Sequence, residues 1–100
     1  MILHAVYLSL AEDADPAELA DVMTGLAALT DLIETFTHGP NFDAEGKTPQ
    51  SHYGFHATFA DRAALERYAT DPRHQALGAR LVALCGGENG ITVYDLDCSN

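Results

Sequence analysis

The stretch from residue 2 to residue 10, Ile-Leu-His-Ala-Val-Tyr-Leu-Ser-Leu, is apolar on both faces when it is folded as a β-strand. Successive side chains of a strand point to opposite faces. One face then carries Ile2, His4, Val6, Leu8 and Leu10, and the other carries Leu3, Ala5, Tyr7 and Ser9. Such a strand belongs between two layers, because either face left in water would expose apolar surface. This feature predicts helices on one side and a second covering layer on the other.

A helix and a second strand are predicted next. Asp13 or Asp15 is suited to the N-cap of the helix, and Pro16 to its first turn. Apolar residues then recur at helical spacing, at Leu19, Val22, Met23, Leu26 and Leu29. Residues 33–38 are predicted to form the second strand, which we expect Gly39-Pro40-Asn41 to end, and residues 39–51 form a loop.

The second half of the chain repeats this pattern. Residues 52–60 alternate as a third strand, with Tyr53, Phe55, Ala57 and Phe59 on one face and His52, Gly54, His56 and Thr58 on the other. Asp61 caps a short helix that carries Tyr68, and Asp71-Pro72 begins a further helix whose apolar stripe includes His74. Gly86-Gly87 end that helix, and residues 91–96 form the last strand.

The order β-α-β-β-α-β, with the second helix broken in two, predicts one α+β domain over residues 1–100 with a ferredoxin-like antiparallel sheet. Helices cover one face of such a sheet. The other face would carry Leu3, Ala5, Tyr7 and Tyr94, which are too apolar to stay in water. We therefore expect a homodimer that buries this face across a two-fold axis.

The charge of the chain limits its partners. The net charge is −10, which disfavours nucleic acid and anionic lipid, so we expect neither as a partner. The N-terminus has no signal-peptide layout and no apolar run is long enough to cross a bilayer, which favours a cytoplasmic location. The acids of residues 12–21 and the arginines of residues 62–80 could form complementary faces or solvated helix exteriors, and we favour the second interpretation.

Neither a metal nor another cofactor is expected. Cys85 and Cys98 lack the spacing of a zinc site. His52 and His56 share a strand face but stand about 13 Å apart, at about 3.3 Å per residue, which is too far to hold one ion. No glycine-rich phosphate-binding or nucleophile-elbow motif occurs in the sequence.

Three residues are candidates for acid–base chemistry. His4 lies on the helix side of the first strand, His74 on a helix stripe, and Tyr68 near the end of the preceding short helix, so all three can converge between sheet and helices. A partly dehydrated imidazole near a phenol suits proton transfer near neutral pH. The alternative is a buried histidine satisfied by one backbone carbonyl and a tyrosine that fills space.

Several segments resemble the stress-responsive A/B barrel domain family. They are the opening Met1-Ile2-Leu3-His4, the Gly39-Pro40-Asn41 segment, the closing Val93-Tyr94-Asp95-Leu96 and, most specifically, residues 64–77, Ala-Leu-Glu-Arg-Tyr-Ala-Thr-Asp-Pro-Arg-His-Gln-Ala-Leu. The resemblance implies a ferredoxin-like monomer that pairs with a second copy into a dimeric α+β barrel. One plant branch, the olivetolic acid cyclases, closes a linear polyketide by aldol condensation without a cofactor, with a Tyr and a His six positions apart.

Tyr68 and His74 keep that spacing, and His4 matches a strand histidine of the same pocket. The resemblance thus implies a cofactor-free cyclase- or lyase-type enzyme for a small apolar carbonyl compound, with His74 as general base and Tyr68 orienting it. Asp71 stands where that branch has His, and smaller side chains replace its helix aromatics. The implied pocket is lined by His4, Val6, Leu8, Val22, Met23, Leu26, Phe36, Phe55, Ile91 and Val93. The alternatives are a non-catalytic, stress-linked ligand-binding dimer and a cofactor-free monooxygenase of a related barrel.

Overall fold

The structure, a computed structural model, describes residues 1–99. Its elements in chain order are β1 (Ile2–Leu8), α1 (Pro16–Ala27), β2 (Thr35–Pro40), β3 (Tyr53–Phe59), α2 (Arg62–Thr70), α3 (Pro72–Leu84), a 3-10 turn (Glu88–Gly90) and β4 (Ile91–Asp97). The strands form one antiparallel sheet in the order β2-β3-β1-β4. The predicted ferredoxin-like α+β class is confirmed, including the break between α2 and α3.

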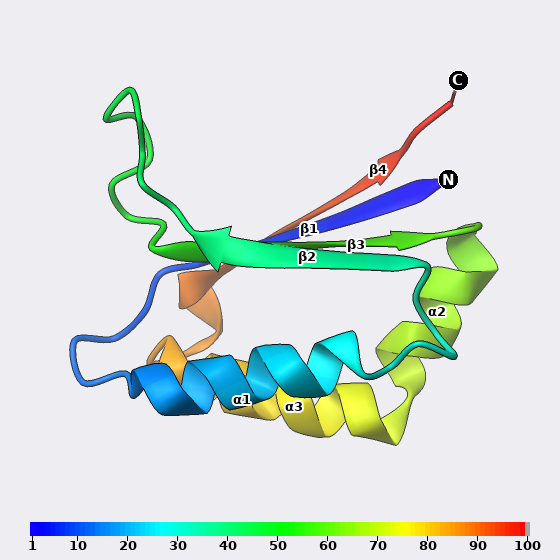
Figure 1. Ribbon diagram of the computed structural model, residues 1–100, viewed down its shortest axis with the longest axis horizontal. Helices are drawn as coiled ribbons and strands as arrows, with labels where there is room; N and C mark the ends of the chain where they lie inside the picture. The colour runs from blue at the N-terminus through cyan, green and yellow to red at the C-terminus, as the bar shows by residue number, and fades with distance from the viewer. Residues whose placement is uncertain (100) are drawn as a thin grey trace.

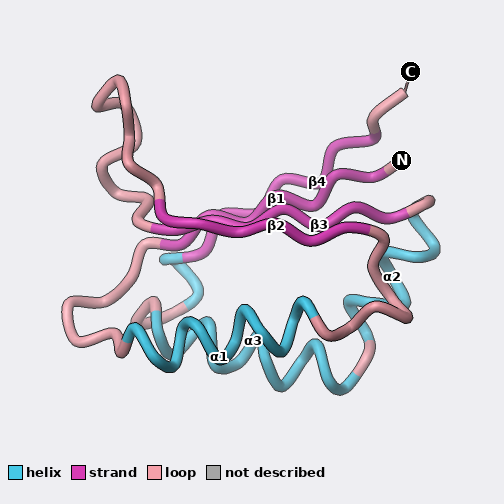
Figure 2. Tube along the Cα trace, viewed as in Figure 1, coloured by secondary structure: helices cyan, strands magenta, loops and turns pink. Residues whose placement is uncertain are grey.

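The molecule has two layers. The sheet forms one layer, α1 and α3 run beneath it, and α2 lies at the end of the sheet where both chain termini are found (Figure 1). The opposite face of the sheet has no helix on it (Figure 2). We call this the bare face; the strand register places Leu3, Ala5, Tyr7, His56, Tyr94 and Leu96 on it. Within residues 1–99, every helix is too short or too polar to span a bilayer.

The core lies between the sheet and the helices. The apolar stripe of α1 meets the helix side of β1 and β3, and its members are almost completely removed from water. The side chains that are at most 1% exposed include Leu8, Val22, Met23, Leu26 and Phe59. Fully burying one such side chain stabilises the fold by about 1.5–3 kcal/mol.

The position of β2 differs from the prediction. It spans Thr35–Pro40 instead of residues 33–38, so Gly39 and Pro40 are its last two residues. Proline is tolerated there because β2 is an edge strand, where one N–H has no partner to lose. Ile33 is buried in a turn after α1, and its N–H donates to the carbonyl of Leu29 at 3.1 Å. β1 also ends two residues earlier than expected, at Leu8.

The acidic and arginine-rich segments do more than face solvent. Arg80 of α3 bonds Glu18 at 2.5 Å and Asp21 at 2.6 Å, and both acids belong to α1. Arg73 bonds Asp31 at 2.8 Å and Asp71 at 3.0 Å. Both arginine side chains keep contact with water, at 37% exposed for Arg80 and 52% for Arg73, so they remain on the exterior. Packing α1 beside α3 also brings opposite charges together at Arg80, which fits the alternative of complementary faces.

Truncating Met23 should test the core directly. Met23→Ala removes a side chain that is 1% exposed and should lower the free energy of unfolding by about 2–5 kcal/mol. Val93→Ala is the matched control, because Val93 is 47% exposed and its truncation should cost roughly 0.5 kcal/mol. Urea unfolding at one protein concentration measures both variants, and equal losses would contradict this placement of the core.

Candidate functional site

The structure brings together the three side chains that the sequence singled out. The ring of Tyr68 lies 4.0 Å from that of His74, centre to centre, and 5.8 Å from that of His4. Tyr68 is near the end of α2 and His74 is in the first turn of α3. Asp71 ends the one helix and caps the other, since its carboxylate accepts the N–H of Arg73 at 2.9 Å. This sharp turn folds His74 back onto Tyr68.

The Tyr68 hydroxyl is an unusual group. Tyr68 is 1% exposed, and among residues 1–99 its hydroxyl oxygen has no hydrogen-bond partner. Burial raises the pKa of the phenol well above its ordinary value, so it stays protonated at neutral pH. Buried polar groups in proteins nearly always have a partner. A protonated phenol without one is a donor available to a bound molecule.

His74 is half-buried beside this phenol. Its Nδ1 is 3.4 Å from the carbonyl oxygen of Ala69, which can only accept, so we assign the proton to Nδ1 and leave the lone pair on Nε2. Burial lowers the pKa of His74, and the nearby His4 acts in the same direction, while the Ala69 carbonyl and Asp71 oppose them. The imidazole is therefore neutral at pH 7 and suited to accept a proton.

A fourth residue, Asp95, joins the cluster and was missed by sequence reasoning. Its Oδ1 is 2.5 Å from Nδ1 of His4, because β1 and β4 pair His4 directly opposite Asp95. A hollow of about 360 Å³ opens beside this pair, lined by Ile2, Arg62, Leu65, Asp95 and Asp97. The sequence does show Asp95 as an acid among the apolar residues of the last strand. It does not show which residue of β1 lies opposite Asp95, so His4 could be identified as its partner only from the strand register.

The apolar residues predicted to line the pocket are mostly packed core, and not all of them are near this cluster. Phe55 lies 6.2 Å from His4, ring centre to ring centre, whereas Leu8 and Ile91 pair at the other end of β1. The side chains that are at most 4% exposed are Val6, Leu8, Val22, Met23, Leu26 and Phe55. Phe36 and Ile91 are partly buried against them, and Val93 is half-exposed. Their role as a pocket wall stays a prediction.

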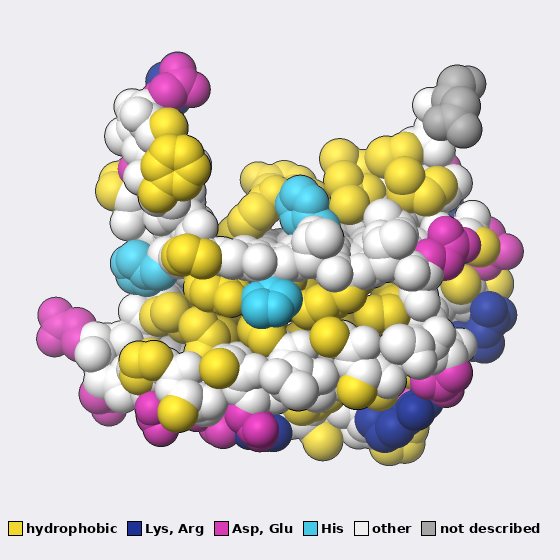
Figure 3. Space-filling model, in the orientation of Figure 1, with side chains coloured by type: hydrophobic (Ala, Val, Ile, Leu, Met, Phe, Trp, Pro, Cys, Tyr) yellow, Lys and Arg dark blue, Asp and Glu magenta, His cyan; other side chains and the backbone are white. Residues whose placement is uncertain are grey.

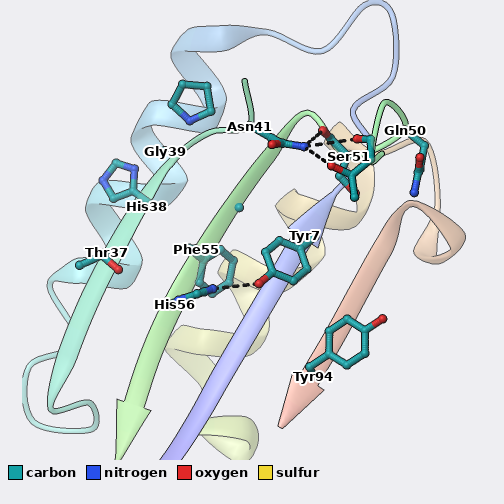
Figure 4. Close-up of a pocket in the computed structure, with 13 residues that line it drawn as sticks. Tyr7, Thr37, His38, Gly39, Asn41, Gln50, Ser51, Phe55, His56 and Tyr94 are labelled. Atoms are coloured by element: carbon teal, nitrogen blue, oxygen red, sulfur yellow. Dashed lines mark hydrogen bonds between the residues drawn. The ribbon is translucent and has the colours of Figure 1, made fainter. Parts of the chain in front are cut away.

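A second, larger cavity lies on the bare face. Residues 41–52, which connect β2 to β3 and which we call the arm, rise above this face at the end away from the termini (Figure 1). The cavity between arm and sheet has a volume of about 530 Å³, and its lining includes Tyr7, His56 and Tyr94. The Tyr7 hydroxyl lies 3.0 Å from Nε2 of His56 (Figure 4). Sequence reasoning placed these side chains on this face but gave no sign of the arm's shape.

The two histidines that were excluded as a metal pair have separate partners. His52 precedes β3 and accepts the N–H of Leu10 on its Nδ1 at 2.9 Å, while His56 contacts Tyr7. Across the part of the chain that the structure describes, no three His, Cys, Asp or Glu side chains are grouped as metal ligands.

Comparison with known proteins assigns the family. The model of the stress responsive A/B barrel domain matches residues 2–98. A dimeric ferredoxin-like protein of unknown function from Jannaschia sp. CCS1 is 39% identical, with a TM-score of 0.89 and coverage of 97% of this chain and 98% of that one. A search of curated proteins finds no match.

More distant structures share the fold alone. The hydroxynitrile lyase from Passiflora edulis is 10% identical, with a TM-score of 0.83 and coverage of 99% of this chain and 94% of that one. An antibiotic biosynthesis monooxygenase is 17% identical, with a TM-score of 0.75 and full coverage of both chains. With its element order, its sheet and a family match over nearly its whole length, the chain belongs to the stress-responsive A/B barrel domain family.

Proposed function

We propose that the protein is a cofactor-free enzyme of the cyclase or lyase type that acts on a small, mostly apolar carbonyl compound. The observation that carries the proposal is the buried Tyr68 hydroxyl, without a partner in the described chain, beside the neutral imidazole of His74. One group can donate a hydrogen bond to an oxygen that gains charge, and the other can accept a proton. Both are needed to form an enolate without a metal.

The proton balance of this reaction is simple. Nε2 of His74 takes a proton from the carbon next to the carbonyl, and the electron pair of that C–H bond moves to the carbonyl oxygen. Tyr68 donates a hydrogen bond to this oxygen as its charge develops. In the cyclase direction the enolate carbon then attacks a second carbonyl carbon, and the protonated His74 gives its proton to the alkoxide oxygen that forms. In the lyase direction His74 takes the proton of the β-hydroxyl group, the carbon–carbon bond breaks to leave the enolate, and the protonated His74 returns the proton to the enolate carbon. His4, held by Asp95, has its ring 5.8 Å from that of Tyr68 and would limit how the substrate is oriented.

Substrate access follows from the same geometry. The hollow beside Asp95 lies between α2 and β4, and Leu65 of α2 lines it one turn before Tyr68. The Tyr68 hydroxyl is closed to water, so α2 must move away from β4 when a substrate enters. Such gating steps are common in enzymes that exclude water during proton transfer.

Two other functions share parts of this support. The dense packing of the residues that would form the pocket, such as Val22 and Leu8 at 0% exposed, would suit a non-catalytic dimer in which this space is simply filled by side chains. A cofactor-free monooxygenase would place the same pair, Tyr68 and His74, beside a bound substrate that carries an oxidisable phenol group. Both the lyase and the monooxygenase of known structure show that this fold accommodates small-molecule chemistry, which is an argument from analogy.

Substitution at the phenol–imidazole pair tests catalysis. His74→Ala and Tyr68→Phe should each lower turnover by at least about 10²-fold, because each removes one partner in the proton transfer. Arg67→Ala, on the exposed side of α2, is the matched control and should keep full activity. The assay is aldol and retro-aldol turnover over a panel of small ketones and aldehydes. If the pair is only structural, no compound turns over and His74→Ala costs about 1–3 kcal/mol of stability.

The pH dependence of folding tests the state of His74. The pKa of His74 is lower in the folded protein than in the unfolded chain, where it is about 6.5. The unfolded chain therefore binds a proton more readily than the folded protein as the pH falls below 6.5. The stability that comes from keeping His74 neutral is fully present above pH 6.5 and is lost as the pH falls through the folded pKa. His74→Gln should therefore flatten the stability profile between about pH 7 and 5. An imidazole that titrates above 6.5 by NMR would contradict the assignment.

We also infer that two copies pair through the bare face. Tyr94 is 54% and Leu96 51% exposed there, and hydrophobic side chains occupy the space between the arm and the termini (Figure 3). β2 and β4 are the edge strands of the sheet, and closing two sheets into a barrel would cover these edges as well as the bare face. The similar protein from Jannaschia is described as dimeric.

Light scattering at micromolar concentration tests this pairing and should give a mass of about twice 10.7 kDa. Leu96→Glu should shift the protein toward monomer, because it places a charge within the apolar contact. Arg67→Glu, on the helix side of the molecule, should leave the mass unchanged. A stable monomer for the unmodified chain would refute the inference.

A further inference from the structure

The large apolar side chains that stay exposed within residues 1–99 gather in two places. Phe42, at 87% exposed, lies on the arm, whereas Val93, Tyr94 and Leu96, at 47–54% exposed, belong to β4. Phe42 is not among the residues that line the cavity beneath the arm, so its ring does not face its own sheet. The ring is therefore available to another molecule that approaches the bare face.

Phe42 is held between two residues that brace the arm. The side-chain amide of Asn41 donates to the carbonyl of Ser51 at 2.8 Å and to the hydroxyl of Thr48 at 3.0 Å. The carboxylate of Asp43 accepts the N–H of Thr48 at 2.9 Å and its hydroxyl at 3.0 Å. An aromatic ring on a segment braced in this way loses little conformational freedom when a partner covers it, which favours affinity.

The distribution of charge selects the partner. The four strands contain two charged residues, Asp95 and Asp97, and the register with β1 places both on the helix side. Two copies that each carry a net charge of −10 repel each other, so they associate most readily through uncharged surfaces. The bare face meets this condition, and Asp43 of the arm directs its carboxylate to Thr48 of the arm itself. A second copy of this chain therefore fits the arm and the bare face together.

The strand that receives Phe42 follows from the two edges of the sheet. The arm follows β2, which is one edge, while β4 is the other edge (Figure 1). When two such sheets close into a barrel, the β2 edge of one copy meets either β2 or β4 of the other. On the bare face, β2 presents Thr35, Thr37 and Gly39, which offer little apolar surface to an aromatic ring. β4 presents Tyr94 and Leu96 there, so β4 is the better match.

We infer that the arm of each copy packs against β4 of the other, with Phe42 in contact with the ring of Tyr94 in the second copy. The ring of Tyr7 flanks Tyr94 at 6.2 Å within its own sheet, and Tyr94 is still 54% exposed, which leaves room for a second ring. The two-fold axis repeats this contact, so it occurs twice in the dimer. The inference rests on the proposed pairing through the bare face and adds to it the arm, with Phe42 as its anchor.

Sedimentation of the full-length protein over a range of concentrations measures what the arm contributes. Phe42→Ala should raise the dissociation constant of the dimer at least about tenfold, because it removes an aromatic anchor of the interface. Glu45→Ala is the matched control on the same arm, since its side chain is 77% exposed, and it should leave the dissociation constant unchanged. Because Phe42 is 87% exposed, the variant should keep the fold of the subunit, which circular dichroism checks.

Two further measurements test the contact itself. In the Tyr94→Ala background, Phe42→Ala should weaken the dimer much less than it does in the unmodified chain, because the two rings act as a pair. In a dimer of one isotope-labelled and one unlabelled copy, filtered NMR should detect nuclear Overhauser effects between the ring protons of Phe42 and Tyr94 of different copies.

The outcomes separate this inference from the pairing on which it rests. A dimer that Phe42→Ala does not weaken, additive effects of the two substitutions, or a Phe42 ring without contacts to the other copy would each overturn the role of the arm, while pairing through the bare face would stand. An unmodified chain that stays monomeric at every concentration would refute both.

Discussion

β1 is hydrogen-bonded on both edges and apolar on both faces, and the rest of the molecule is arranged around it. Its partners β3 and β4 fix the register that brings Asp95 opposite His4 and Gly54 opposite Tyr7. One face is closed by α1 and α3, which bury the stripe from Leu19 to Leu26. The other face holds Tyr7 and the cavity beneath the arm. β1 thus supplies His4 to the cluster on the helix side of the sheet and Tyr7 to the cavity on the bare face.

The turn at Asp71 is the second constraint. Its carboxylate caps α3 and also bonds Arg73, which reaches on to Asp31 after α1. This network holds the turn between α2 and α3, where the rings of Tyr68 and His74 meet at an angle of 40°. Where the cyclase branch has a histidine, this chain has a residue that holds the turn. Tyr68 is thus positioned both by the turn at Asp71 and by its contact with Phe59 of β3.

Much of the fold and part of the site could be predicted from the sequence. Asp15, Asp61 and Asp71 mark the helix starts, because a short acidic side chain before a helix satisfies its free N–H groups. The strand and helix patterns singled out His4, Tyr68 and His74, the family resemblance implied their roles, and the structure places their rings together. Gly39 and Pro40 were predicted to follow the second strand, but they are its last two residues, because the edge position that makes proline acceptable depends on strand order.

Other features depend on contacts between distant segments and could not be read from local patterns. The His4–Asp95 pair is separated by 91 positions, and it appears only when β4 docks beside β1. Arg80 finds Glu18 and Asp21 only when α3 packs on α1. The cavity of the bare face needs the arm's internal bonds around Asn41 and Asp43, which no periodicity indicates. Local sequence patterns located the helices and strands, whereas contacts between distant segments of the chain formed the side-chain clusters.

The most direct test of the account is a crystal structure with acetylacetone, a small diketone whose planar enol resembles an enolate. The account predicts one of its oxygens at about 2.7–2.8 Å from the Tyr68 hydroxyl, the usual O–H···O distance, with its central carbon facing Nε2 of His74. α2 should then lie farther from β4 than in the unliganded protein. A Tyr68 hydroxyl that stays sealed, or that bonds only to protein atoms while the diketone binds elsewhere, would contradict the account.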